Sequence, residues 1–144
     1  MCWAMYLFTD NVIDEIKWDD NNPGLFIEKI YKEKNMDYNV NNWNENNKNI
    51  YYIGSSQGCG CGWQSPNHEF LDLNDEDEKK EYENKIKDRI ELFKILNKNI
   101  NNGSFFIICW EGDQGNEIKQ ILNFNIELIK DDNYQFEELI KYMI

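Results

Sequence analysis

Residues 75–101 read DEDEKKEYENKIKDRIELFKILNKNIN, and the apolar run FFIICW follows at residues 105–110. In the first stretch, apolar side chains recur at spacings of three and four, which predicts one long amphipathic helix with these side chains buried. They are Tyr82, Ile86, Ile90, Phe93, Leu96 and Ile100. Asn74 or Asp75 can cap the start of this helix, and Asn102-Gly103 supplies a left-handed stop at its end.

Two further apolar runs precede the helix. They are CWAMYLF at residues 2–8 and IYYIG at residues 50–54. Short unbroken apolar runs are typical of strands that are covered on both faces. A strand, a long helix and a strand in that order predict a parallel crossover unit. We therefore expect an α/β (or α+β) fold with a central mixed or parallel sheet and the long crossover helix packed on it.

Three segments fit more than one kind of element. Periodicity does not distinguish helix from strand at residues 25–31 or at residues 118–129. Residues 137–144 fit either a helix or an edge strand that closes the sheet. No internal repeat or long linker divides the chain, so residues 1–144 are predicted to form a single globular domain.

Composition excludes several classes of protein. The chain has 144 residues, 15 Lys and Arg against 27 Asp and Glu, and a formal charge of −12. With 41% hydrophobic residues, including 5 Trp, 8 Tyr and 8 Phe, it has enough apolar surface to bury a core, which argues against disorder. Nucleic acids and anionic membranes are bound through clustered Lys and Arg, but the chain has only one arginine, Arg89. We expect neither as a partner.

The compartment follows from the N-terminal sequence. No run approaches 18 apolar residues, and Asp10 and Asp14 interrupt the first apolar stretch before a signal peptide could form. A cytoplasmic, reduced protein is predicted. In that compartment cysteines are buried apolar residues, metal ligands or reactive thiols more often than disulfide partners.

The segment GCGCG at residues 58–62 is the least ordinary part of the sequence. In an extended backbone Cys59 and Cys61 project from the same side, and two such thiols can supply two ligands to a soft metal such as zinc. Cys2 and Cys109 could complete the site, with His68 as a substitute for one of them.

The same segment has simpler interpretations. It also fits a glycine-rich hairpin with Ser56-Gln57-Gly58 as its turn and both cysteines buried as small apolar residues. A reactive thiol, or an anion cradle formed by exposed backbone amides, is a further alternative.

Cys2 suggests a separate hypothesis. If Met1 is removed, the α-amine of Cys2 could activate its own thiol, as in N-terminal-nucleophile hydrolases. The candidate catalytic residues are therefore Cys2, Cys59 and Cys61.

Polar residues follow each of the three predicted strands. If the strands run parallel, these residues meet at the carboxyl ends, where open α/β sheets place their ligand crevice. Carboxylates there could bind a cation or act as acid and base. The candidate ligand-binding residues are Asp10, Ser55, Glu111 and Asp113, with Thr9 and Ser56 beside them.

Three patches together resemble an uncharacterised family of small bacterial proteins that carries no assigned activity. The patches are Met1-Cys2-x-Ala4-x-Tyr6, Tyr52-Ile53-Gly54-Ser55-x-x-Gly58-Cys59-Gly60-Cys61-Gly62-Trp63 and Cys109-Trp110-Glu111-Gly112-Asp113-Gln114. The glycine-cysteine patch is the most specific of them. The resemblance implies a bacterial, cytoplasmic protein.

The sequence thus predicts a small cytoplasmic bacterial domain that binds a small ligand or a metal at the glycine-cysteine segment near strand ends. Two alternatives stay open. One is an acidic inhibitor or immunity-type protein that masks a basic protein partner through its charge. The other is an N-terminal-cysteine hydrolase.

Overall fold

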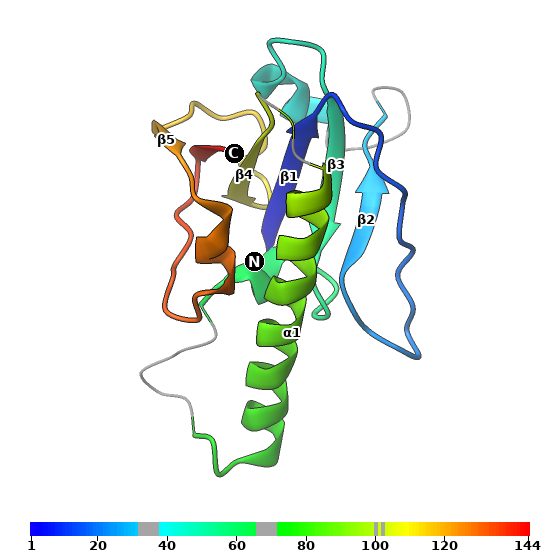
Figure 1. The fold of residues 1–144 in the computed structure, drawn as a ribbon, viewed down its shortest axis with the longest axis vertical. Coiled ribbons are helices and arrows are strands. Elements are labelled where there is room, and N and C mark those ends of the chain that lie inside the picture. The colour runs from blue at the N-terminus through cyan, green and yellow to red at the C-terminus, as the bar shows by residue number, and fades with distance from the viewer. Residues whose placement is uncertain (32–37, 66–71, 100, 102) are drawn as a thin grey trace.

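The structure, a computed structural model, describes the chain except for residues 32–37, 66–71, 100 and 102. Six strands form one mixed sheet in the order β2-β3-β1-β4-β6-β5 (Figure 1). All neighbouring strands are antiparallel except β5 and β6. The strands are β1 (Trp3–Thr9), β2 (Phe26–Lys29), β3 (Asn49–Gly54), β4 (Phe105–Trp110), β5 (Gln120–Asn123) and β6 (Ile140–Met143).

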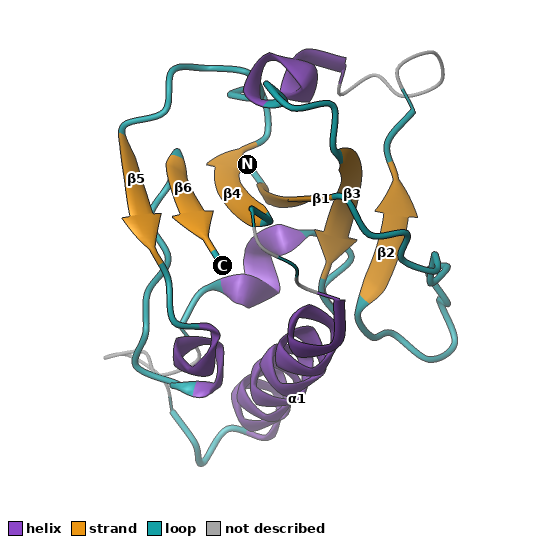
Figure 2. Cartoon of the chain, turned by 45° about the horizontal axis from the view of Figure 1, so that its top comes forward, coloured by secondary structure: helices purple, strands orange, loops and turns teal. Residues whose placement is uncertain are grey.

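One long helix, α1 (Glu76–Asn99), packs against one face of this sheet (Figure 2). Three short 3-10 helices lie in the connections: η1 (Tyr38–Trp43), η2 (Gly60–Trp63) and η3 (Ile126–Lys130). The predicted α+β fold, a single domain with a mixed sheet and a long packed helix, is confirmed. No helix in the described part of the chain is both long enough and apolar enough to span a bilayer.

The predicted crossover is present, but it passes over a strand. Helix α1 leads from β3 to β4, and both of these strands are antiparallel to β1, which lies between them. Strands β3 and β4 therefore run parallel to each other without being neighbours.

A shared ligand crevice depends on all three apolar runs being parallel, and this condition is not met, because β1 runs antiparallel to β3 and β4. In the sheet, Trp3 lies opposite Trp110 and Thr9 lies opposite Asn49. An apolar run indicates a strand but carries no information about its direction, because either direction satisfies the backbone hydrogen bonds. As a result, the beginning of β1 meets the ends of β3 and β4.

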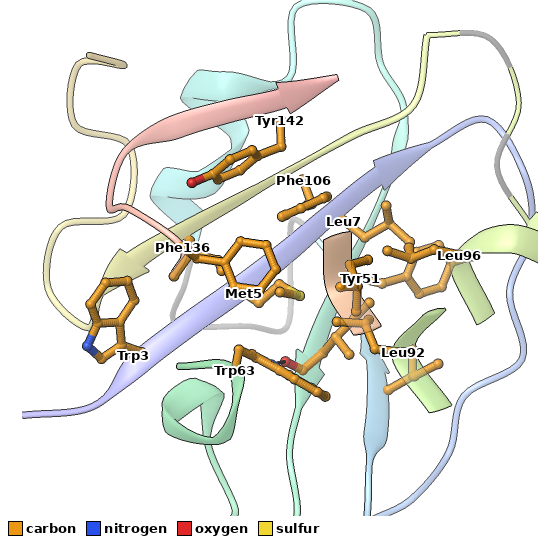
Figure 3. Packing of buried hydrophobic residues seen from close by; sticks show 14 of the residues in the cluster. Trp3, Met5, Leu7, Tyr51, Trp63, Leu92, Leu96, Phe106, Phe136 and Tyr142 are labelled. Atoms are coloured by element: carbon orange, nitrogen blue, oxygen red, sulfur yellow. Dashed lines mark hydrogen bonds between the residues drawn. The ribbon is translucent and has the colours of Figure 1, made fainter. Parts of the chain in front are cut away.

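Strand β1 is buried on both faces, as its unbroken apolar run predicts. Trp3, Met5 and Leu7 belong to the core cluster on the α1 face, together with Trp63 and Leu92 (Figure 3). The alternate residues belong to a second cluster on the opposite face; they are Ala4, Tyr6 and Phe8.

The buried face of α1 differs from the predicted apolar stripe. Ile90 is 39% exposed, whereas the charged Asp88 and Arg89 are 2% and 1% exposed. The helix thus turns polar side chains inward, because they hydrogen-bond to loops that cover it. The buried helix residues are Lys85, Asp88, Arg89, Leu92 and Leu96. Ile100, the last residue of the predicted stripe, lies outside the described residues.

The ambiguous segments resolve mainly into strands. Residues 25–31 contain β2, and residues 118–129 contain β5 followed by the start of η3. Residues 137–144 contain β6, which lies between β4 and β5 and is therefore an interior strand. Pairing with neighbours distant in sequence selects these strands, which local periodicity cannot do.

Candidate functional site

Three cysteines meet where the beginning of β1 lies against the segment after β3. Cys2 directly precedes β1, while Cys59 and Cys61 lie at the start of η2, and Figure 1 places the N-terminus beside this part of the chain. The sulfur atoms of Cys2, Cys59 and Cys61 all lie within 4.8 Å of one another. Each residue is partly exposed, and none of the four cysteines, all within the described residues, forms a disulfide. These three residues, the thiol cluster, can hold a metal ion.

Two backbone amides point at the sulfur atoms of the thiol cluster. The amide N–H of Cys61 donates to Sγ of Cys59 at 3.3 Å, and the amide N–H of Trp3 donates to Sγ of Cys61 at 3.4 Å. A hydrogen bond from N–H stabilises negative charge on its acceptor. Each of these two sulfur atoms therefore already accepts one hydrogen bond from the backbone.

Gly60, between the two cysteines, is required by packing, and Gly58, before them, by its backbone conformation. A Cβ atom on Gly60 would lie 2.6 Å from the carbonyl oxygen of Trp3, so only glycine lets η2 approach β1 this closely. Gly58 has a φ of +78°, which L side chains rarely adopt, and its amide closes a turn by donating to the carbonyl oxygen of Ser55 at 3.0 Å. The alternation of glycine and cysteine is what brings the three sulfur atoms together.

The hairpin interpretation of this segment is wrong. The turn lies where it was predicted, but the chain returns as η2 instead of a strand, and Cys59 and Cys61 stay partly exposed. Ser55 is fully buried and holds the turn, since its hydroxyl donates to the carbonyl oxygen of Cys59 at 2.7 Å and accepts from the amide of Gly62 at 3.2 Å.

Helix α1 anchors both sides of the segment. The Asp88 carboxylate accepts hydrogen bonds from the amide N–H, at 2.9 Å, and from the hydroxyl of Ser56. The Arg89 guanidinium donates to the carbonyl oxygens of Trp63 at 3.0 Å and Tyr134 at 2.7 Å, and also to that of Asp131. The chain's one arginine is therefore a buried structural residue.

The environment of Cys59 does not activate it as a nucleophile. Burial raises the pKa of the Cys59 thiol to about 12, and the neighbouring thiols of Cys61 and Cys2 add to the shift. Reactive cysteines depend on a lowered pKa, because the thiolate is the nucleophile. A bound cation would replace the proton and offset part of the negative charge on the three crowded sulfur atoms.

The candidate ligand residues that follow strands lie at two opposite ends of the central strands. Asp10 follows the last residue of β1, at the other end of this strand from the thiol cluster. Its carboxylate forms an ion pair with Lys48 at 3.2 Å. Glu111 and Asp113 lie on the cluster side, where the Glu111 amide donates to the carbonyl oxygen of Cys2 at 2.8 Å. Neither acidic side chain is among the groups within 4.8 Å. The antiparallel direction of β1 causes this division.

The remaining candidate metal ligands lie elsewhere. Cys109 is fully buried in the cluster on the face of the sheet away from α1, with Ala4 and Ile107, and it is not part of the thiol cluster. His68 lies outside the described residues. Of the partners proposed for Cys59 and Cys61, the structure brings Cys2 to them.

Sequence reasoning missed the residues that support the site. The apolar stripe predicts that Asp88 and Arg89 lie on the solvent side of the helix, so it gives no indication that they anchor the loops. A signal was present, since Lys85, Arg89, Leu92 and Leu96 recur at the same three- and four-residue spacing. The amides that point at the sulfur atoms carry no sequence signal.

Comparison of the chain with protein-family models, with curated proteins and with solved structures found no match.

Proposed function

We propose that this protein binds a soft metal ion through the thiolates of Cys2, Cys59 and Cys61. The observation that carries the proposal is the mutual distance of the three sulfur atoms, at most 4.8 Å. Thiolates select soft or borderline ions such as zinc and monovalent copper. Cys2 and η2 are already packed together, so the backbone does not have to rearrange for the three sulfur atoms to bind one ion.

The surroundings support metal binding more than nucleophilic chemistry. Metal-bound cysteines are deprotonated, so binding releases protons and depends on pH. The amides of Cys61 and Trp3 donate to the sulfur atoms of Cys59 and Cys61, while burial raises the pKa of the Cys59 thiol, so this thiol is poorly suited to act as a free nucleophile. A metal would also link the residue before β1 to the loop after β3.

Cadmium is the most direct probe for this site, because thiolate-to-cadmium charge transfer gives a strong ultraviolet band. We expect the reduced protein to bind one Cd²⁺ per chain. Binding should protect Cys2, Cys59 and Cys61 from a thiol-labelling reagent, because metal-bound sulfur does not react. Zinc should bind at the same stoichiometry, and cadmium should displace it, because thiolates hold the softer ion more tightly.

A matched control is available within the chain. Cys109→Ser should leave the band and its stoichiometry unchanged, because Cys109 lies on the other face of the sheet. Cys2→Ser, Cys59→Ser and Cys61→Ser should each weaken the band. Absence of a cadmium band in the wild-type protein, or a band that survives all three substitutions, would refute the proposal.

A further inference from the structure

The thiol cluster offers an unusual number of ligands. Three sulfur atoms lie within 4.8 Å of one another, and no carboxylate or imidazole from the described residues joins them at that distance. Structural zinc sites almost always have four protein ligands in a tetrahedral arrangement. A three-sulfur site suits an ion that is stable with three soft ligands, and monovalent copper is such an ion.

We infer that the thiol cluster is a three-coordinate, all-sulfur site for monovalent copper. This inference rests on the proposed function and goes beyond it by naming the ion and its coordination number. The two ideas can fail separately, because zinc or cadmium binding needs neither copper nor a coordination number of three.

The spacing of the sulfur atoms fits a planar arrangement. Three sulfur atoms placed about 2.3 Å from a central ion, at the corners of a triangle, lie about 4.0 Å apart. In the structure they lie at most 4.8 Å apart. No pair therefore has to close by more than about 1 Å, a change within the reach of side-chain rotation.

The surroundings of the cluster shield one side of the site and leave the other accessible. On one side Cys61 packs against the apolar cluster that contains Trp3 and Trp63. Trp3 is in turn packed against Trp110, with the ring centroids 4.7 Å apart. These side chains keep water from that side of the ion, while the partial exposure of all three cysteines leaves the other side open for the ion to enter.

The net charge of the copper-bound site follows from its three thiolates and one ion. One Cu⁺ displaces three thiol protons to solvent, and no electron is transferred. The bound group then carries a net charge of −2. The amides of Cys61 and Trp3 offset part of this charge, because their N–H groups already point at the sulfur atoms of Cys59 and Cys61.

The test is an anaerobic titration of the reduced protein with Cu⁺, held monovalent by ascorbate, against a coloured copper chelator. We expect one copper per chain. X-ray absorption of the wild-type complex should show three sulfur ligands and no nitrogen or oxygen ligand. This measurement needs no variant, so it does not depend on whether a substituted chain folds.

Substitutions test the coordination number independently. Cys2→Ser, Cys59→Ser and Cys61→Ser should each lower the copper affinity by more than about tenfold, since even removing a hydrogen-bond partner of a metal ligand costs about 10- to 100-fold. Cys109→Ser should retain the wild-type affinity.

Three results would overturn the inference. They are two sulfur ligands by X-ray absorption, wild-type copper affinity in any one of the three cluster variants, and a cluster of several copper ions. If cadmium binding still required all three cysteines, the proposed function would stand without the copper assignment.

Discussion

At the scale of single residues, the thiol cluster depends on a glycine, Gly60, as much as on its three cysteines. Gly60 lets η2 lie against the backbone of Trp3, and the amide of Trp3 is thereby able to donate to Sγ of Cys61. A larger residue would separate the two segments and move the sulfur atoms apart. The glycine therefore sets the geometry of the proposed metal site through the position of its neighbours.

Gly60→Ala should destabilise the protein and weaken metal binding together. The added Cβ meets the Trp3 carbonyl oxygen at 2.6 Å, and overpacking of this kind costs about 1–3 kcal/mol in the free energy of unfolding. Urea unfolding and cadmium titration measure the two effects. Gly24→Ala is the matched control, because nothing lies within 4 Å of its added Cβ. Equal behaviour of the two variants would contradict the packing role of Gly60.

At the scale of elements, α1 has a capped N-terminus and a buried face that contains polar side chains. Asp75 caps the helix, since its carboxylate accepts from the amides of Asp77 at 2.9 Å and Glu78 at 3.1 Å. Further along, Asp88 joins the helix to the turn that contains Ser56, and Arg89 joins it to Trp63 of η2. The helix thus positions the glycine-cysteine segment as well as covering the sheet.

Asp75→Ala should lower the free energy of unfolding by about 1 kcal/mol, because two amides at the start of α1 lose their acceptor. Thermal or urea unfolding measures the loss. Asn74→Ala, one residue earlier in the chain, should have little effect, since no hydrogen bond from the Asn74 side chain contributes to the cap. A larger loss for Asn74→Ala than for Asp75→Ala would show that the cap is assigned to the wrong residue.

Asp88 gives the helix anchor a pH dependence. Burial raises the pKa of the Asp88 carboxyl above its ordinary value of 3.8, although hydrogen bonds from Ser56 partly oppose the shift. The folded protein therefore holds this proton more tightly than the unfolded chain does. The contribution of Asp88 to stability is then greatest below pH 3.8 and falls as pH rises from 3.8 through the raised folded pKa.

Asp88→Asn removes this titration while keeping an oxygen that can accept from Ser56. The free energy of unfolding of the variant, relative to wild type, should increase as pH rises from about 4 toward neutrality. Urea unfolding at a series of pH values measures the difference. A difference that stays constant, or that decreases with pH, would show that burial does not dominate the pKa of Asp88.

At the scale of the whole molecule, a metal in the thiol cluster would close a link between distant parts of the chain. Cys2 precedes β1, which is the strand between β3 and β4 in the sheet, and η2 follows β3. The same end of β1 is held to the end of β4 by the bond from the Glu111 amide to the carbonyl oxygen of Cys2. Binding should therefore stabilise the entire fold, because the unfolded chain does not hold the three thiols together.

Saturating cadmium should raise the melting temperature of the reduced wild-type protein. At a free ion concentration about 100 times the dissociation constant, one site adds about 2.7 kcal/mol to the free energy of unfolding. Cys2→Ser should lose most of this increase, whereas Cys109→Ser should keep it, each variant being compared with its own metal-free form. A full increase in Cys2→Ser would mean that the ion binds without the link to β1.

The sequence by itself determined the elements whose signals are local. Unbroken apolar runs predicted β1, β3 and β4, and three- and four-residue periodicity with a capping residue at Asn74 or Asp75 predicted α1. The glycine-cysteine segment was also recognised as the candidate site, because two thiols separated by one glycine are unusual in any element. These features depend on residues close together in the chain, so one sequence is enough to reveal them.

Only the tertiary structure decided the direction of β1, the buried face of α1 and the third member of the thiol cluster. Strand direction depends on pairing with β3 and β4, since either direction satisfies the same backbone groups. The strand pairing and the burial of Cys109 on the other sheet face then selected Cys2 as the partner of Cys59 and Cys61. Contacts between residues distant in sequence made each of these choices, and no local pattern records such contacts.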